Sequence, residues 1–163
     1  EIFYRIQLWD LAGQDQNTCI TKIFSKNAQG CIVLCDITNA DSLNDTLKWK
    51  ESVDETTRFA DGELLPSVLV QNKIDLVEED VVKNDEEIKK FANENKFSGF
   101  FRTSAKTGFG IDECLEFLIS NIIDRMEKSA KGGNNPFEKD RKSLVLEHKK
   151  AAQPTGGMSN GCC

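Results

Sequence analysis

Histidine is nearly absent from this sequence of 163 residues, which has one histidine, three prolines and eleven glycines. His148 lies in the polar C-terminal stretch, and there is no Cys-x-x-Cys pair, so neither a histidine-based catalytic triad nor a structural zinc site is expected. No apolar run approaches the ~18 residues of a membrane span. With 29% charged residues, the composition also excludes collagen-like, repeat-built and fully disordered chains. The length suits one globular domain with a tail.

The six cysteines bear on the cellular compartment of the protein, and its uneven charge distribution bears on the partners that it can bind. No segment resembling a secretory signal follows Glu1, so we expect reduced thiols, rather than a disulfide framework, in a cytosolic product or a fragment. Residues up to Met126 carry 14 basic against 23 acidic side chains, a balance of −9, and the remainder carries 7 against 4, a balance of +3. Because an acidic body repels a phosphate backbone, we expect no nucleic-acid partner.

Segments with strand patterns alternate with helical segments along the chain. Residues 2–9 show a period of two, in which Ile2, Tyr4, Ile6 and Leu8 alternate with Phe3, Arg5, Gln7 and Trp9. This pattern predicts a strand whose two faces differ and which ends at Asp10. Runs rich in apolar residues predict three further strands, at 31–35, 67–71 and 99–102. Helices are predicted at 42–57, 85–94 and 112–128. This order favours an α/β domain with a parallel sheet, in which ligands bind at the carboxyl ends of the strands.

The first polar motif at a strand end is Asp10-Leu-Ala-Gly13-Gln14. Asp10 could hold Mg²⁺ through water, the Gly13 backbone N–H could bond a terminal phosphate, and Gln14 could orient an attacking water. An isolated D-x-x-G tetrapeptide is also typical of an ordinary Asx-type turn. The motif alone therefore leaves both interpretations open.

The second motif, Asn72-Lys73-Ile-Asp75, directly follows the strand predicted at 67–71. The Asp75 carboxylate could accept hydrogen bonds from N1–H and the N2 amine of guanine, an edge that adenine does not present. Asn72 could bridge the base to neighbouring loops, and the aliphatic stem of Lys73 could cover the purine face. A simple polar loop at a strand end is the alternative.

Ser104-Ala105-Lys106, the third motif, follows the strand predicted at 99–102. The Ala105 N–H could bond guanine O6, Ser104 could brace the loop, and the Lys106 stem could pack under the base. A tripeptide carries almost no information by itself. All three motifs nevertheless occur just after a predicted strand, and this joint arrangement favours guanine-nucleotide binding over three unrelated loops.

On these motifs the sequence resembles the small Ras-like GTPases and, among them, the Rab proteins of membrane traffic. The stretch from Trp9 to Asp15 is similar to the Rab pattern W-D-T-A-G-Q-E, with departures at Leu11 and Asp15. Further blocks similar to those of Rab proteins follow in the expected order: Asp36-Ile-Thr38, Lys48-Trp-Lys50, Asn72 to Asp75 and Thr103 to Lys106. The resemblance covers residues 2–126. The long stretch 58–66, with Trp49, is most similar to the Rab branch of lysosome-related organelles.

The C-terminal stretch adds to the resemblance. Residues 129–163 lose apolar periodicity and end at Cys162-Cys163, which resembles the geranylgeranylation site of Rab proteins. Two lipid chains would give stable anchoring where one gives reversible binding, and two incidental thiols are the alternative. We therefore divide the chain into a partial GTPase domain, 1–128, and a flexible tail, 129–163, that ends in a prenylation site.

One element that the family requires, the phosphate-binding loop G-x-x-x-x-G-K-[ST], is absent, since no glycine here is followed by lysine. The family places that loop, its strand and the first switch segment before Glu1. The expected fold is thus α/β, with an incomplete Ras-like doubly wound sheet that lacks the first strand and the phosphate loop, and with a disordered tail. GTP or GDP and Mg²⁺ are expected for the complete protein, whereas guanine recognition by this chain alone should be weak.

Two functional hypotheses follow. In the first, the complete protein is a GTP-hydrolysing Rab switch in vesicle traffic, with Gln14 as its catalytic residue. The resemblance then implies an exchange factor, an activating protein, effectors, an escort protein and a GDP-dissociation inhibitor as partners. It also implies a monomer that cycles between the cytosol and the cytosolic face of an endomembrane. In the second, the chain is a truncated, prenylated, membrane-tethered interaction protein that does not hydrolyse GTP.

Overall fold

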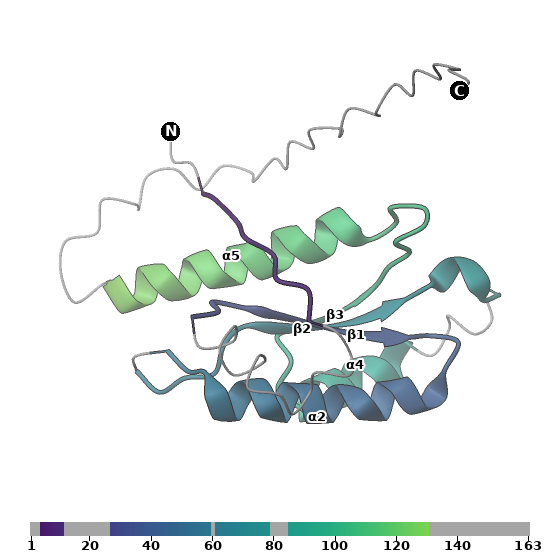
Figure 1. The fold of residues 1–163 in the computed structure, drawn as a ribbon, viewed down its shortest axis with the longest axis horizontal. Coiled ribbons are helices and arrows are strands. Elements are labelled where there is room, and N and C mark those ends of the chain that lie inside the picture. The colour runs from purple at the N-terminus through teal and green to yellow at the C-terminus, as the bar shows by residue number, and fades with distance from the viewer. Residues whose placement is uncertain (1–3, 12–26, 60, 79–84, 131–163) are drawn as a thin grey trace, which may run out of the picture.

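The computed structural model describes residues 4–11, 27–59, 61–78 and 85–130, which contain a three-stranded sheet with helices on both faces (Figure 1). Its elements are β1 (Cys31–Asp36), α2 (Ala40–Thr56), β2 (Ser67–Asn72), the 3₁₀ helix η2 (Ile74–Leu76), α4 (Asp85–Glu94), β3 (Gly99–Arg102) and α5 (Ile111–Ala130). Helices α2 and α4 cover one face of the sheet, and α5 covers the other. No helix within these ranges combines the length and the apolar character that a membrane span requires.

The strands run in the order β1-β2-β3, and both pairs are parallel. The register pairs Cys31 with Ser67 and Asp36 with Asn72. Strand β2 is central, and three consecutive apolar side chains on it are almost fully buried: Val68, Leu69 and Val70. A strand covered on both faces requires such a continuous apolar run. The α/β class, with parallel strands alternating with helices, is therefore confirmed.

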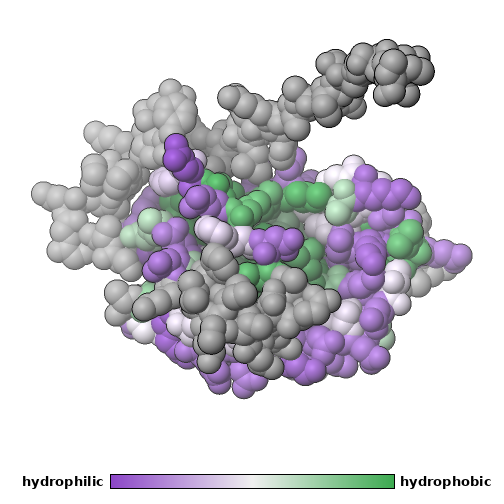
Figure 2. Space-filling view, viewed as in Figure 1, coloured by the Kyte–Doolittle hydropathy of each residue, from purple (hydrophilic) through white to green (hydrophobic). Residues whose placement is uncertain are grey.

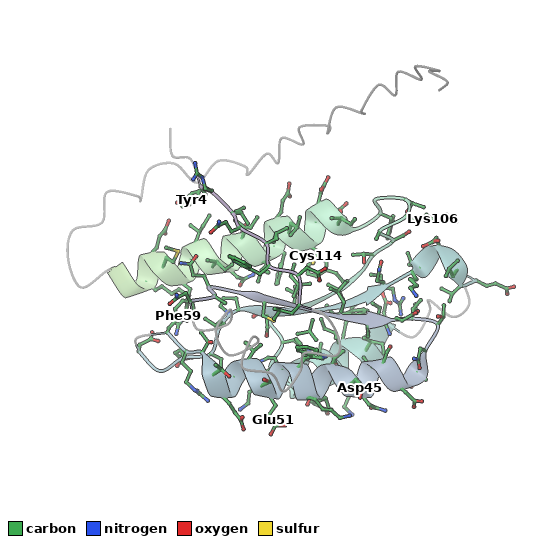
Figure 3. All side chains as sticks on the ribbon, viewed as in Figure 1. Tyr4, Asp45, Glu51, Phe59, Lys106 and Cys114 are labelled. Carbon is green, nitrogen blue, oxygen red and sulfur yellow. The ribbon has the colours of Figure 1, made fainter. Side chains whose placement is uncertain are left out.

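Alternate residues of β2 supply two separate cores. Leu69 lies in the cluster under α2 and α4, together with Val33, Cys35, Ala92 and Phe97. Val68 and Val70 lie in the cluster under α5, together with Cys114 and Leu118. Cys114 projects from α5 in Figure 3. Burying each large aliphatic side chain stabilises the folded state by about 1.5–3 kcal/mol, so the packing of helices on both faces stabilises the sheet.

The cysteines of the described part are free thiols. Burial raises the pKa of Cys35 and of Cys114 to about 11. These two thiols are therefore almost fully protonated at neutral pH and act as small apolar core residues. Three further cysteines lie outside the described residues: Cys19, Cys162 and Cys163.

The observed helix ends differ slightly from the predicted ones, and a capping side chain explains the largest difference. Helix α2 begins two residues before the predicted 42–57 because the Asn39 side chain caps it, accepting the Asp41 N–H at 3.1 Å. Helix α4 has the predicted bounds. Helix α5 is slightly longer than predicted.

A tight loop joins α2 to β2, at the end of the sheet opposite the carboxyl ends of the strands. Arg58 forms an antiparallel bridge with Leu64, and Gly62 makes the turn with a φ of +83°. Arg125 of α5 fixes this loop, since its Nη2 lies 3.1 Å from Asp61 Oδ2. The loop corresponds to the stretch 58–66 singled out in the sequence.

The strand predicted over residues 2–9 is wrong for the described residues 4–11, which form no strand. A strand needs a hydrogen-bonded neighbour, and none of β1, β2 and β3 pairs with this segment. Its Tyr4, Ile6 and Leu8 side chains are 46%, 46% and 72% exposed. Apolar side chains also gather in the middle of the face shown in Figure 2. The expected doubly wound sheet is thus present in part, and the predicted tail lies outside the described residues.

Candidate functional site

The carboxyl ends of β2 and β3 bring two of the three sequence motifs side by side (Figure 1). Asn72 is the last residue of β2, and Arg102 is the last residue of β3. Beyond the strands, the Thr103 N–H donates to Gln71 O at 2.9 Å, and the Ile74 N–H donates to Thr103 O at 3.2 Å. These hydrogen bonds continue the ladder into the loops, so the two motifs leave the sheet as neighbours.

Asn72 ties the first loop to the second. Its Oδ1 accepts hydrogen bonds from Thr103 Oγ1 at 3.2 Å and from the Ala105 N–H at 3.1 Å. Asn72 therefore joins the two loops to each other, and the predicted bridge from a base to the loops stays a prediction. The same contact engages the Ala105 N–H, so a ligand that uses this donor has to share it or displace the Asn72 oxygen.

Asp75 and Ser104 form the second link between the loops. Ser104, which is completely buried, donates from Oγ to Asp75 Oδ1 at 2.6 Å, and the same Oγ accepts the Thr107 N–H at 3.1 Å. Lys106, 78% exposed, places Nζ 3.9 Å from Asp75 Oδ2. One carboxylate oxygen of Asp75 is thus held by a buried hydroxyl, while the other faces the exposed lysine. Figure 3 shows Lys106 at the end of the molecule opposite Phe59.

Lys73 connects the site to β1. Its backbone is left-handed, with φ 70° and ψ 32°, and its Nζ lies 2.6 Å from Asp36 Oδ2. The hydrogen bond from Lys73, with further donors from Thr38, lowers the pKa of Asp36 from 3.8 to about 2. The sequence assigned Lys73 to a purine face, and in the structure its ammonium group is held at the end of β1.

Glycine 110 was not singled out in the sequence, although the local geometry requires a glycine there. Gly110 has a φ of +70°, and a Cβ at this position would lie 2.1 Å from the carbonyl oxygen of Arg102. The close approach lets the loop from Arg102 fold back, with the Ser104 N–H donating to Phe109 O at 3.0 Å. The signal was visible as the pair Gly108 and Gly110 before α5.

Of the first motif, Asp10-Leu-Ala-Gly13-Gln14, the structure describes only Asp10 and Leu11. Asp10 is exposed, forms part of no strand, and makes none of the contacts that join the two loops. Gly13 and Gln14 lie outside the described residues, as do Cys162 and Cys163. Within residues 4–11, 27–59, 61–78 and 85–130, no three His, Cys, Asp or Glu side chains form a group that could hold a metal ion.

The strand-end loops bring hydrogen-bonding groups of both kinds together. The Asp75 carboxylate is an acceptor, the Ala105 N–H is a donor, and two lysine side chains lie beside them. In the described part, these groups come from the strand-end loops: Asn72, Lys73, Asp75, Ser104, Ala105 and Lys106. This combination suits a ligand with adjacent donors and one acceptor on its edge.

Comparisons with known proteins agree with this geometry. A family model described as the Ras family matches residues 2–124. The Ras-related protein Rab-32 of Mus musculus is 32% identical over 159 residues, which are 98% of this chain and 67% of that protein. Rab-32 of Sus scrofa is 38% identical over 119 residues, 73% of this chain and 52% of the relative. Rab-7L1 of Homo sapiens is 34% identical over 119 residues, 73% of this chain and 58% of the relative.

The chain thus spans from about half to two thirds of the length of these relatives. The range matched by the family model includes the two loops that the structure joins. The chain therefore belongs to the Ras family, and its relatives within that family are Rab proteins.

Proposed function

We propose that the complete protein is a GTP-binding and GTP-hydrolysing molecular switch of the Rab type that regulates vesicle and membrane traffic. The observation that carries this proposal is the pair of contacts that joins the strand-end loops. Asn72 Oδ1 holds the Ala105 N–H, and Ser104 holds Asp75. A base-reading site needs its acceptor and its donor fixed relative to each other, and these contacts supply that rigidity.

Guanine is the base that this donor and acceptor set fits. Asp75 Oδ1 is occupied by Ser104, so the remaining acceptor capacity of the carboxylate is available for N1–H and the N2 amine. The Ala105 N–H would donate to O6, sharing or leaving Asn72. Adenine presents neither the N1 donor nor the O6 acceptor. The proposed selectivity therefore comes from two unmatched polar groups if adenine enters.

The phosphate chemistry is assigned to the first motif. Asp10 would hold Mg²⁺ through water, the Gly13 N–H would contact the γ-phosphate, and Gln14 would orient the attacking water. Mg²⁺, when bound, would neutralise charge on the β- and γ-phosphates. The described residues alone provide no cluster for the ion. Asp10 is therefore proposed to act with the nucleotide's own oxygens and with residues beyond the described ranges.

The membrane end of the cycle is assigned to the tail. Prenylation at Cys162 and Cys163 would anchor the protein to the cytosolic face of an endomembrane. Extraction of the lipid chains from the membrane would return the protein to the cytosol. Exchange factor, activating protein, effectors, escort protein and GDP-dissociation inhibitor are the proposed partners. Similarity to Rab-32 and the loop at 58–66 support a place in the branch of lysosome-related organelles.

A second candidate is a prenylated, non-hydrolysing protein that tethers Rab partners to a membrane. The transcript upstream of Glu1 separates the two candidates. An in-frame phosphate-binding loop there would remove the second candidate, and an in-frame stop codon directly upstream would remove the first.

A binding experiment on the 163-residue chain tests the phosphate reasoning. We expect no sub-micromolar binding of mant-GDP in the presence of Mg²⁺, because the chain has no loop to neutralise the β-phosphate. Circular dichroism on the same sample reports whether the chain is folded, and ATP serves as the competitor. Tight, guanine-selective binding by this chain would show that the phosphate-binding loop is dispensable.

A further inference from the structure

We propose that Arg102 is a positioning residue for base recognition. In this role, its guanidinium bridges Gln71 and Asp85 and so fixes the two base-contacting loops relative to each other and to α4. The role in recognition rests on the proposed function. The bridge itself stands on the geometry of three side chains that no sequence motif included.

The bridge starts from the last paired position of β2 and β3. Gln71 and Arg102 are register partners, and Arg102 Nε donates to Gln71 Oε1 at 3.2 Å. On the other side, Arg102 Nη1 forms an ion pair with Asp85 Oδ1, in the first turn of α4. The side chain of Arg102 is 8% exposed, and Gln71 is equally buried. Burial strengthens the contact between Arg102 and Gln71, whereas the Asp85 side chain is 48% exposed, so solvent screens the ion pair.

The bridge lies directly before the second motif and two residues before the third motif. Gln71 directly precedes Asn72, and Arg102 directly precedes Thr103. A backbone hydrogen bond from the Thr103 N–H to Gln71 O links the two strand ends at the same point. Because β3 has four residues, few ladder bonds hold its end, and a strand end of this kind frays readily. The side-chain bridge limits sliding and rotation of the loops where the ladder stops.

Arginine suits this place for a geometric reason. The guanidinium is planar, and its Nε and Nη groups donate in different directions within that plane. One side chain can therefore reach an acceptor on β2 and a second one on α4 at the same time. The guanidinium also lies 5.6 Å from the centre of the Phe100 ring, which fixes its plane further. A lysine at this position could not make the same pair of contacts in fixed directions.

Hydrogen exchange on the 163-residue chain tests the bridge without any nucleotide. In Gln71→Leu, we expect amides in 103–110 to exchange about tenfold faster, as expected for the loss of one hydrogen bond to a charged group. Exchange in α2 should not change. Gln71→Glu, which restores an acceptor for Nε, should return exchange to the unsubstituted rate. An unchanged loop in Gln71→Leu, or equal effects of Leu and Glu, would overturn the bridge.

Arg125→Met is the matched control, because Arg125 is also an ion-paired arginine but lies at the opposite end of the sheet. It should increase exchange in the 58–64 loop and leave 103–110 unchanged. Faster exchange of 103–110 in this control would show that the loop responds to any loss of packing, which would contradict a specific role for Arg102.

The positioning role requires a readout in nucleotide recognition, on a protein extended to the length of its relatives. The probe pair is GDP and the diphosphate of 2-aminopurine riboside, which keeps the N2 amine but lacks both O6 and the proton on N1. Arg102→Met should reduce the preference for GDP over this analogue about tenfold, because the displaced Asp75 and Ala105 no longer gain full hydrogen bonds from N1–H and O6. An equal loss of affinity for both nucleotides would show that Arg102 supports the fold and does not position the base-contacting loops, which would contradict the proposal. If the unsubstituted protein does not distinguish the pair, guanine recognition itself fails, whatever the exchange data show about the bridge.

Discussion

Asp75→Asn is the substitution that most sharply tests guanine recognition. In the structure, the buried Ser104 hydroxyl donates to Asp75 Oδ1 at 2.6 Å. An asparagine can keep an oxygen at this position, so the contact with Ser104 and the fold of the loop should survive. The amide nitrogen then takes the place of Oδ2 and presents a donor where guanine also presents donors. The preference should move from guanine to xanthine, whose C2 carbonyl is an acceptor.

The magnitude follows from the two hydrogen bonds that the carboxylate offers to guanine. A hydrogen bond to a charged group contributes about 1.5–3 kcal/mol. Asparagine keeps one acceptor oxygen, so one of the two is lost, which costs about 1.5–3 kcal/mol and corresponds to roughly 10–10²-fold in affinity at 1.4 kcal/mol per decade. Competition of GDP and XDP against mant-GDP, on a protein extended to the length of its relatives, measures this ratio directly.

Asp45→Asn supplies the control, because Asp45 is an exposed carboxylate on α2, with Lys48 as its partner (Figure 3). This control should leave the GDP to XDP ratio unchanged. If Asp75→Asn binds GDP as tightly as the unsubstituted protein does, Asp75 does not read the base. If it unfolds instead, the assumption that Ser104 keeps its partner is wrong.

Three further predictions concern catalysis, stability and pH. Gln14→Leu should slow stimulated GTP hydrolysis by orders of magnitude and leave nucleotide affinity nearly unchanged in single-turnover assays, and an equal loss of binding would assign Gln14 a structural role. Asp54→Ala should lower the free energy of unfolding by about 3–5 kcal/mol in urea titrations, because it strands the Lys50 ammonium, which is 4% exposed and lies 2.5 Å from Asp54. Replacing Lys50 by Met in the same chain should recover most of that loss, and no recovery would refute the buried-charge explanation. The pKa of Asp36 is lowered on folding, so its stabilising contribution is complete above its ordinary pKa of 3.8 and disappears as the pH falls towards about 2. The difference in urea midpoint between the unsubstituted chain and Asp36→Asn should accordingly shrink over this range, and a pH-independent difference would contradict the pairing with Lys73.

The sequence was sufficient to predict the parallel strands because their burial leaves a local record. Val68, Leu69 and Val70 read as a buried strand without any knowledge of their neighbours. The segment 4–11 carried an equally clear alternating pattern, yet it forms no strand. Alternation reports which side chains suit a sheet, whereas a strand also requires a partner that a local pattern cannot reveal.

In the candidate site, too, some residues were predicted from the sequence and some contacts were not. Asn72, Asp75 and Ser104 were found because each follows a strand end, and parallel strands bring their ends together. The contact of Lys73 with Asp36 and the bridge from Arg102 to Gln71 were not found. Both join residues more than 30 positions apart in the sequence, and their side-chain directions depend on the folded register.

The central claim is that the joined loops select guanine in a protein that acts as a nucleotide switch. The most direct test is competition of GDP and ADP against mant-GDP on a protein extended to the length of its relatives, with Mg²⁺ present. The account predicts that GDP competes at least about 10³-fold better than ADP, because adenine leaves both Asp75 and the Ala105 N–H without partners. Equal competition by the two nucleotides, in a protein shown to be folded, would contradict it.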